Sequence, residues 1–178
     1  MSGDIDMAKY RLLKLPLPTH DQEAASKKYH DDNLPPGGYT EGARAYSGVN
    51  QAIPNATFTV LALELELYDT DTIHDLVINN SRLTCKTAGI YLIAGSANII
   101  SNAIGRRSLL LRLNGIATYA YVEWDTNQNG GTFMHLSTIL RLAITNFVEL
   151  SVYQSSGGVL NSLFADYYGI QLMMQRIG

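Results

Sequence analysis

The chain is poor in cysteine, in tryptophan and, over most of its length, in charge. Its 178 residues include a single cysteine, Cys85, which excludes an intrachain disulfide framework and a zinc site built from several cysteines. No apolar run is long enough to span a membrane, and the first ten residues are charged and lack the apolar stretch of a secretory signal. We therefore expect a chain made as a soluble protein, without membrane insertion.

Basic residues and histidines are also too sparse for several functions. The formal net charge is -3 and no cluster of Lys and Arg is visible, which argues against binding to nucleic acid. No histidine has a second ligand type at the spacing of a zinc site or a metalloprotease helix; the four are His20, His30, His74 and His135. We predict no metal site, no cofactor and no nucleic-acid partner.

The residues around His74 are the richest in groups that carry chemistry. Asp69, Asp71 and Asp75 could hold a hard cation such as calcium, but the segment lacks the glycine and terminal Glu of an EF-hand loop, so a solvated loop is favoured. His74 and Asp75 near Ser81 suggest a catalytic triad, yet no strained nucleophile turn accompanies them. We predict that the chain is not an enzyme and has no catalytic residue.

The remaining composition is that of one globular domain with a short segment attached. Hydrophobic residues make up 46% of the chain, enough to bury a core. Residues 1–43 contain four of the five lysines, and charge is sparse after them. The run Pro-Pro-Gly-Gly at residues 35–38 interrupts regular structure. We predict an N-terminal segment over residues 1–33, a linker over residues 34–42 and a head domain over residues 43–178.

The N-terminal segment carries one helix signal. Residues 19–22 fit a capping box, or Asp21 caps the helix alone, and Ala24, Ala25 and Tyr29 then form a narrow stripe at helical spacing. A helix of about a dozen residues is marginal in water by itself. We expect it to pack against copies of itself or against a partner.

After residue 43 the pattern is all-β. Residues 58–68 alternate leucines with glutamates in the period of a half-exposed strand. Asn114-Gly115 between two apolar runs predicts a type I′ hairpin, because this turn needs positive φ at both central positions. Further strands are predicted over residues 43–49, 133–142, 147–154 and 166–177. About eight to ten strands at regular spacing indicate a sandwich or jelly roll.

The longest apolar run, residues 81–100, predicts a central strand. Its apolar side chains fall on both faces, Ile90 and Leu92 on one and Tyr91 and Ile93 on the other. A buried helix is the alternative, which the glycines within the run disfavour. A two-sheet sandwich covers only the inner face of each sheet, so this strand suggests a second protein surface against its outside. The pattern therefore favours an oligomer.

Two further features are open to more than one interpretation. Arg106 and Arg107 form either a solvated loop, which is favoured, or an anion site. The chain has eleven tyrosines, and tyrosine suits partly wet interfaces. Sugar-stacking platforms or oligomer contacts are conceivable for several, although packing is favoured for any single one; these include Tyr119, Tyr121, Tyr167 and Tyr168.

Residues 15–32, LPLPTHDQEAASKKYHDD, are similar to a motif common in bacteriophage tail fibres and related virion proteins. That motif has a strand-like segment, a proline turn and a helix of the pattern DQ-A-A-(S/T)-KKY-(V)-D. His30 stands where the motif has valine. The resemblance implies that this segment attaches the protein to a virion, and the residues that carry it are Leu15, Pro16, Pro18, Asp21, Gln22, Ala24, Ala25, Lys27, Lys28 and Tyr29.

Residues 44–178 resemble the C1q/TNF-like trimeric jelly roll found in phage and bacterial proteins. The resemblance lies in ordered blocks at residues 43–46, 51–54, 74–75, 81–93, 105–107, 113–115, 137–142 and 148–158. It implies an all-β sandwich of about ten strands that forms a homotrimer through the outside of one sheet, with no catalytic residues. By analogy, the first and last strands lie near the threefold axis, and the trimer interface includes Tyr46, Tyr91, Ile170, Leu172 and Met174.

Together, these resemblances imply a short trimeric fibre or spike of a bacteriophage, made in the cytoplasm of the host bacterium and located on the virion. Its N-terminus would contact other virion proteins, and its head would attach to a glycan or protein of the host surface. The alternative is a C1q-like module that binds carbohydrate or protein, or a capsid decoration protein without a receptor. The position on the virion, whether capsid, neck, tail fibre or baseplate, stays open.

Overall fold

The computed structural model describes Thr19 and residues 39–125, 130–164 and 169–178. The chain divides into two compact units, residues 1–38 and residues 39–178, and the division falls inside the linker predicted at residues 34–42. We call residues 39–178 the head. The predicted helix and the predicted attachment residues lie outside the described residues.

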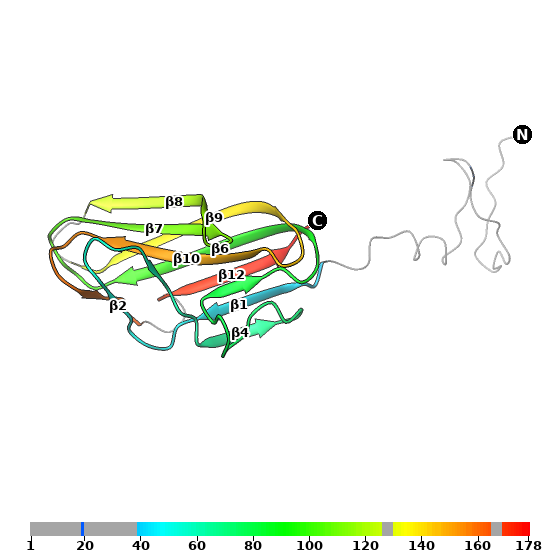
Figure 1. Cartoon of the computed structure of the whole chain (residues 1–178), viewed down its shortest axis with the longest axis horizontal. Coiled ribbons are helices and arrows are strands. Elements are labelled where there is room, and N and C mark those ends of the chain that lie inside the picture. The colour runs from blue at the N-terminus through cyan, green and yellow to red at the C-terminus, as the bar shows by residue number, and fades with distance from the viewer. Residues whose placement is uncertain (1–18, 20–38, 126–129, 165–168) are drawn as a thin grey trace, which may run out of the picture. The chain divides into compact units, whose positions relative to one another are not determined.

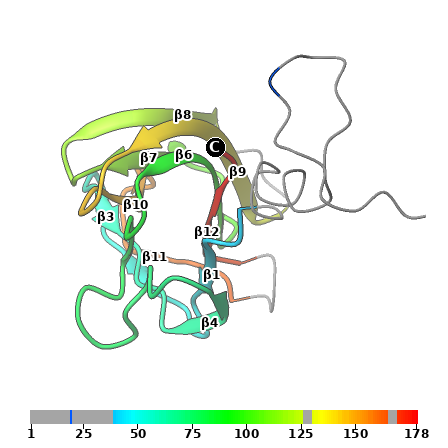
Figure 2. The same ribbon diagram turned by 90° about the vertical axis from the view of Figure 1, so that its right-hand side faces the viewer.

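The head is a sandwich of antiparallel sheets (Figures 1 and 2). What we call the β6 sheet has the order β4-β1-β12-β6-β9, with β4 at Leu65–Asp69, β1 at Gly42–Tyr46, β12 at Gln171–Arg176, β6 at Gly89–Ile99 and β9 at Thr132–Leu142. The β7 sheet has the order β3-β10-β7-β8, and β5 also pairs with β10. Its strands are β3 at Thr59–Val60, β10 at Phe147–Gln154, β7 at Arg106–Leu113, β8 at Ala117–Asp125 and β5 at Arg82–Thr84. A short pair joins β2, Ala52–Ile53, to β11, Leu160–Asn161.

The two large sheets enclose one apolar core. Figure 2 shows them curving around a common interior, and β8 at the end of one sheet lies against β9 at the end of the other. The core receives alternate residues of each strand, including Ile93 of β6, Leu111 of β7 and Leu150 of β10. Each fully buried Leu or Ile contributes about 1.5–3 kcal/mol. Among the described residues there is no helix long and apolar enough to cross a membrane.

The apolar run at residues 81–100 is extended, as predicted, but it forms two strands in place of one. β5 pairs with β10 in the β7 sheet, whereas β6 lies between β12 and β9 in the other sheet. Cys85, buried and free, sits at the corner, where its N–H donates to the carbonyl of Asn146 and its carbonyl accepts from Thr145. The run therefore crosses the sandwich, and only its second part is an interior strand of a sheet.

Residues 58–68 also divide between the two sheets, so the single strand predicted there is wrong. β3 pairs with β10, and β4 pairs with β1. Between them Leu61 and Leu63 are buried in the core, and their N–H groups donate to the carbonyls of Leu150 and Asn80. The alternation of leucine and glutamate agrees with burial only as far as Leu63, since Leu65 and Leu67 are each 42% exposed, and it did not reveal the change of partner strand.

The hairpin predicted at Asn114-Gly115 is confirmed. The two residues have φ of 53° and 71° and join β7 to β8. Asn114 is also bonded to β10, because its side-chain oxygen accepts from the N–H of Phe147 and its own N–H donates to the Phe147 carbonyl, both at 2.9 Å. The strands predicted over residues 133–142 and 147–154 correspond to β9 and β10, and the last predicted strand corresponds to β12.

Candidate functional site

The side chains that suggested catalysis have structural roles. His74 Nδ1 lies 2.8 Å from a carboxylate oxygen of Glu66, and its Nε2 lies 3.0 Å from the carbonyl oxygen of Asn80. The imidazole is buried, and with both nitrogens occupied it has none free to take a proton from a serine. Within residues 39–125, 130–164 and 169–178, no three His, Cys, Asp or Glu side chains are grouped as a metal site would require.

Two acidic residues near His74, Asp69 and Asp75, bind backbone N–H groups of their own loop. Asp69 accepts from the N–H groups of Asp71, Ile73 and His74 at 2.8–3.1 Å. Asp75 accepts from those of Val77 and Ile78, each at 2.8 Å, and these bonds lower the pKa of Asp75. The carboxylates of Asp69 and Asp75 therefore stabilise turns within the loop, where the sequence favoured a solvated loop over calcium binding.

The outer face of the β6 sheet is the candidate site. On β12, Leu172 and Met174 are fully buried, so Met173 between them points away from the core. On β6, Tyr91 and Ile93 are fully buried, so Leu92 points outward in the same way. The sheet therefore presents to solvent a second set of side chains, separate from its core set.

Much of this outer set is apolar. Leu92 is 43% exposed, and Ile139, which lies opposite it on β9, is 58% exposed. On the other side of β12, Tyr46 of β1 lies opposite Leu65 of β4, which is 42% exposed. We call this surface the outer patch, and its members are Tyr46, Leu65, Tyr68, Leu92, Phe133, Ile139 and Met173. An apolar surface spread over five strands is typical of a site where proteins meet.

Two polar residues of this face, Arg44 and Gln171, are bonded to each other. The guanidinium of Arg44 on β1 donates to the side-chain oxygen of Gln171 on β12, with its Nε at 3.1 Å and one Nη at 2.6 Å. Both residues point outward, because their neighbours Ala45 and Leu172 are buried. A polar pair whose members already bond to each other is less costly to cover with another protein.

The predicted interface residues divide between the two faces. Tyr46 lies on the outer face, but Tyr91, Leu172 and Met174 are fully buried in the core and Ile170 is 3% exposed. Their predicted placement on the outside of the sheet is therefore wrong. Because the strands are apolar on both faces, alternation separated the two sets of residues without revealing which set was inward. On β12 the glutamines at 171 and 175 were a usable signal, since Met173 shares their face.

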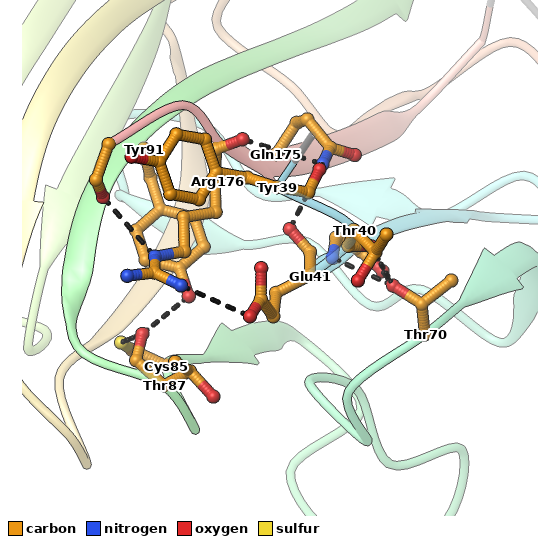
Figure 3. A network of polar contacts seen from close by, with 11 residues as sticks. Tyr39, Thr40, Glu41, Thr70, Cys85, Thr87, Tyr91, Gln175 and Arg176 are labelled. Carbon is orange, nitrogen blue, oxygen red and sulfur yellow. Dashed lines mark hydrogen bonds and ion pairs between the residues drawn. The ribbon is translucent and has the colours of Figure 1, made fainter. Parts of the chain in front are cut away.

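Tyr91 stabilises the core side of β6. Its hydroxyl donates to the carbonyl of Thr87 at the corner before the strand, and the thiol of Cys85 donates to the same carbonyl at 3.2 Å (Figure 3). Burial raises the pKa of the Tyr91 hydroxyl and of the Cys85 thiol, so both stay protonated at neutral pH. These contacts assign Tyr91 to folding of the corner.

A second part of the network in Figure 3 fixes the first residues of the head to β12. Arg176 bonds the carboxylate of Glu41 at 3.1 Å, and its guanidinium lies over the ring of Tyr39, 4.7 Å from the centroid. The side-chain amide of Gln175 donates to the carbonyls of Tyr39 and Glu41 at 3.0 and 3.2 Å. The chain therefore enters the head beside the last strand, and we call this set of contacts the N-terminal clamp.

No protein-family model matches the chain, and no curated protein matches it. Solved structures do resemble it. Murine APRIL at pH 5.0 aligns with a TM-score of 0.60 and 7% identity, covering 76% of this chain and 98% of that chain. Eiger TNF from S. frugiperda gives 0.56 and 10%, covering 79% and 94%, and the globular domain of zebrafish complement 1qA gives 0.53 and 14%, covering 78% and 98%. At these identities the likeness concerns the fold alone: the head is an all-β jelly-roll sandwich of the kind seen in TNF and C1q domains.

Proposed function

We propose that the chain is a non-enzymatic structural protein of a bacteriophage virion, a short trimeric fibre or spike with an N-terminal anchor. The outer patch carries the trimer part of this proposal. It is a face of the β6 sheet with at least five apolar residues more than 40% exposed, on a chain that has no excess of charge to keep copies apart. Three copies that cover this face would bury it in the assembly.

The virion part of the proposal rests on the sequence of residues 15–32, which resembles the attachment segment of phage fibres. The division of the chain after Gly38 supports it, because a compact head preceded by a separate unit suits an anchored and displayed module. In this arrangement the N-terminal unit contacts other virion proteins. The three heads then offer repeated contacts to a host surface, so that weak single contacts add up by multivalency.

The mass of the full chain in solution tests the trimer. Light scattering behind a sizing column, at several concentrations, should give three times the chain mass of 19.6 kDa. A stable monomer would overturn the proposed trimer and would leave the exposed apolar face of the β6 sheet without this explanation. Virion incorporation tests the anchor: removal of residues 1–33 should abolish incorporation, and unchanged incorporation would exclude this segment as the anchor.

A second candidate function is a C1q-like module that binds carbohydrate or protein. The observation that favours it is a set of exposed aromatic side chains on β8 and just before β3, including Tyr119, Tyr121 and Phe58, each at least 50% exposed. Binding of the purified head to host cells would support this function, whereas incorporation into virions without any such binding would leave a decoration role.

A further inference from the structure

The β7 sheet has an outer face of its own, formed by residues that alternate with the core set. Leu109 and Leu111 of β7 belong to the core, so Ser108 and Leu110 lie on the other side of the strand, where they are themselves largely covered, at 2% and 8% exposed. In the ladder, Glu123 of β8 lies opposite Ser108, and Tyr121 lies opposite Leu110. This face belongs to the other sheet from the outer patch, so both surfaces can be occupied at the same time.

Aromatic rings stand on this face with much of their surface in solvent. Tyr121 is 54% exposed and Phe58 is 57% exposed. Phe58 is held against Tyr153 of β10, with 5.1 Å between ring centroids, and the guanidinium of Arg106 lies 5.4 Å from the Tyr153 ring centroid. Rings fixed in this way offer contact area at a small cost in conformational entropy.

A carboxylate is fixed beside these rings. Glu123 accepts hydrogen bonds from the hydroxyls of Ser108, at 2.8 Å, and Tyr121, and it forms an ion pair with Arg106 at 3.3 Å. The hydrogen bonds from Tyr121 and Ser108 lower the pKa of Glu123, so it is ionised at neutral pH. The face therefore has a hydrogen-bond acceptor and a donor, Glu123 and Arg106, next to an exposed aromatic ring.

A hollow of about 140 Å³ lies on the same face, between Phe58 and the tip of the β7–β8 hairpin. It is lined by Phe58, Leu110, Arg112, Ile116 and Thr118. Ser151 of β10, next to Leu110 in the ladder, is fully buried, and its hydroxyl has no hydrogen-bond partner in the described part of the chain. A mostly apolar hollow with a few polar groups around it is typical of a small-ligand site.

The charges on this face are already balanced. Arg106 is paired with Glu123, and Arg112 lies 4.0 Å from Glu149. An anionic ligand would have to compete with these carboxylates, so the face has no preference for negative charge. It instead suits a neutral molecule with one apolar side and many hydroxyls.

We propose that this face binds a neutral oligosaccharide. A pyranose ring has a side of C–H groups, which is attracted to the negative face of an aromatic ring, here Tyr121 or Phe58. Its hydroxyls then bond to the carboxylate of Glu123 and the guanidiniums of Arg106 and Arg112. The inference names the class of ligand that the displayed head of the proposed function would bind. It rests on that function in one respect only, the gain in binding from three sites on one particle.

The experiment uses the full chain and an array of immobilised neutral oligosaccharides of glucose, galactose, mannose and N-acetylglucosamine, with heparin fragments as an anionic probe. We expect binding to at least one neutral series and none to heparin. Tyr121→Ala should weaken it at least tenfold, the change that about 1.4 kcal/mol produces. Tyr121→Phe, which keeps the ring, should lose less, and Glu123→Gln should weaken binding as well.

Val77→Ala is the control, since it removes an 87%-exposed apolar side chain from the β4–β5 loop, outside this face. It should bind as the unaltered chain does. Absence of binding to every neutral saccharide, binding to heparin alone, or binding that Tyr121→Ala leaves intact would each overturn the proposal. The mass of every variant is measured alongside. A monomer that still binds saccharide would overturn the proposed trimer and not this site. A trimer that binds no saccharide would overturn this site and not the trimer.

Discussion

Arg107 carries a guanidinium group into the interior of the sandwich. The residue has no exposed surface and lies on the inward side of β7, so the solvated loop predicted for Arg106 and Arg107 is wrong. Its Nη1 donates to the carbonyls of Ile104 and Arg106 at 3.0 Å, and its Nη2 donates to that of Asn102 at 3.3 Å. Burial lowers its pKa. The side chain thus fixes the loop that precedes β7.

Replacement of Arg107 by alanine should destabilise the head by about 2–4 kcal/mol, because it leaves a cavity in the core and unpaired carbonyls in the loop. Arg107→Lys should cost less than the alanine variant, since it keeps the bulk of the side chain but not its fork of donors. Urea unfolding at fixed protein concentration measures both. A change below about 0.5 kcal/mol for the alanine variant would show that the loop does not depend on Arg107.

From the hydrogen bonds of Asp75 we predict that the stability of the β4–β5 loop depends on pH. Its pKa is lowered in the folded chain by the N–H groups of Ile78 and Val77. A lowered pKa means that the carboxylate stabilises the loop above its ordinary pKa of about 3.9, and that this stabilisation is lost as pH falls through the folded value. The N–H groups of Val77 and Ile78 should therefore lose protection in acid, as followed by hydrogen exchange corrected for intrinsic rates. Asp75→Asn, which keeps an acceptor oxygen, should show no such transition.

Among the elements, hairpins were easier to predict than crossings. The turn at Asn114-Gly115 depends on two neighbouring residues and their φ, so local sequence was enough. The crossings at residues 61–64 and 85–88 depend on which distant strand supplies hydrogen bonds, and β10 supplies them to both β3 and β5. Such pairings involve residues about 60 to 90 positions apart, so the periodicity within one segment cannot reveal them.

The candidate site, too, could be predicted from the sequence only in part. The sequence indicated that apolar residues on two faces of one strand require a second protein surface, and the exposed fraction of Leu92 agrees with this interpretation. Most of the residues predicted for the interface face the core. On β12 one reason is the run Leu-Met-Met, in which either methionine could face the core. Gln171 and Gln175 share the face of Met173, and the antiparallel pairing with β1 and β6 puts Met174 beside the core residues Ala43 and Ile93.

Met173 and Met174 form a matched pair for testing the outer patch. Met173→Glu places a charge on the outer face of β12 and should dissociate the assembly into folded monomers, since a buried unpaired charge opposes association. Met174→Glu places the same charge in the core and should unfold the head instead. Light scattering and circular dichroism separate the two outcomes. An intact assembly with Met173→Glu would show that copies do not meet through this face.

As a whole molecule, the chain is two units joined near Gly38. The head has its own core, and the N-terminal clamp supplies hydrogen bonds to residues 39–41 from β12. We therefore expect a chain of residues 39–178 to fold alone, to melt within a few degrees of the full chain and to keep its ratio of particle mass to chain mass. Calorimetry and light scattering measure these properties. A smaller ratio would indicate that the N-terminal unit contributes to assembly.

The N-terminal clamp also determines how the head would bear a mechanical load. A pull on the linker reaches the head at Tyr39 and passes directly into β1, which is hydrogen-bonded to β12 on one side and β4 on the other. When the force acts along the strand, both ladders are loaded in shear, and their bonds must yield together instead of opening one after another. The ion pair of Arg176 with Glu41 closes the end where peeling would begin. Residues 39–46 thus make the junction between the head and the linker resistant to pulling.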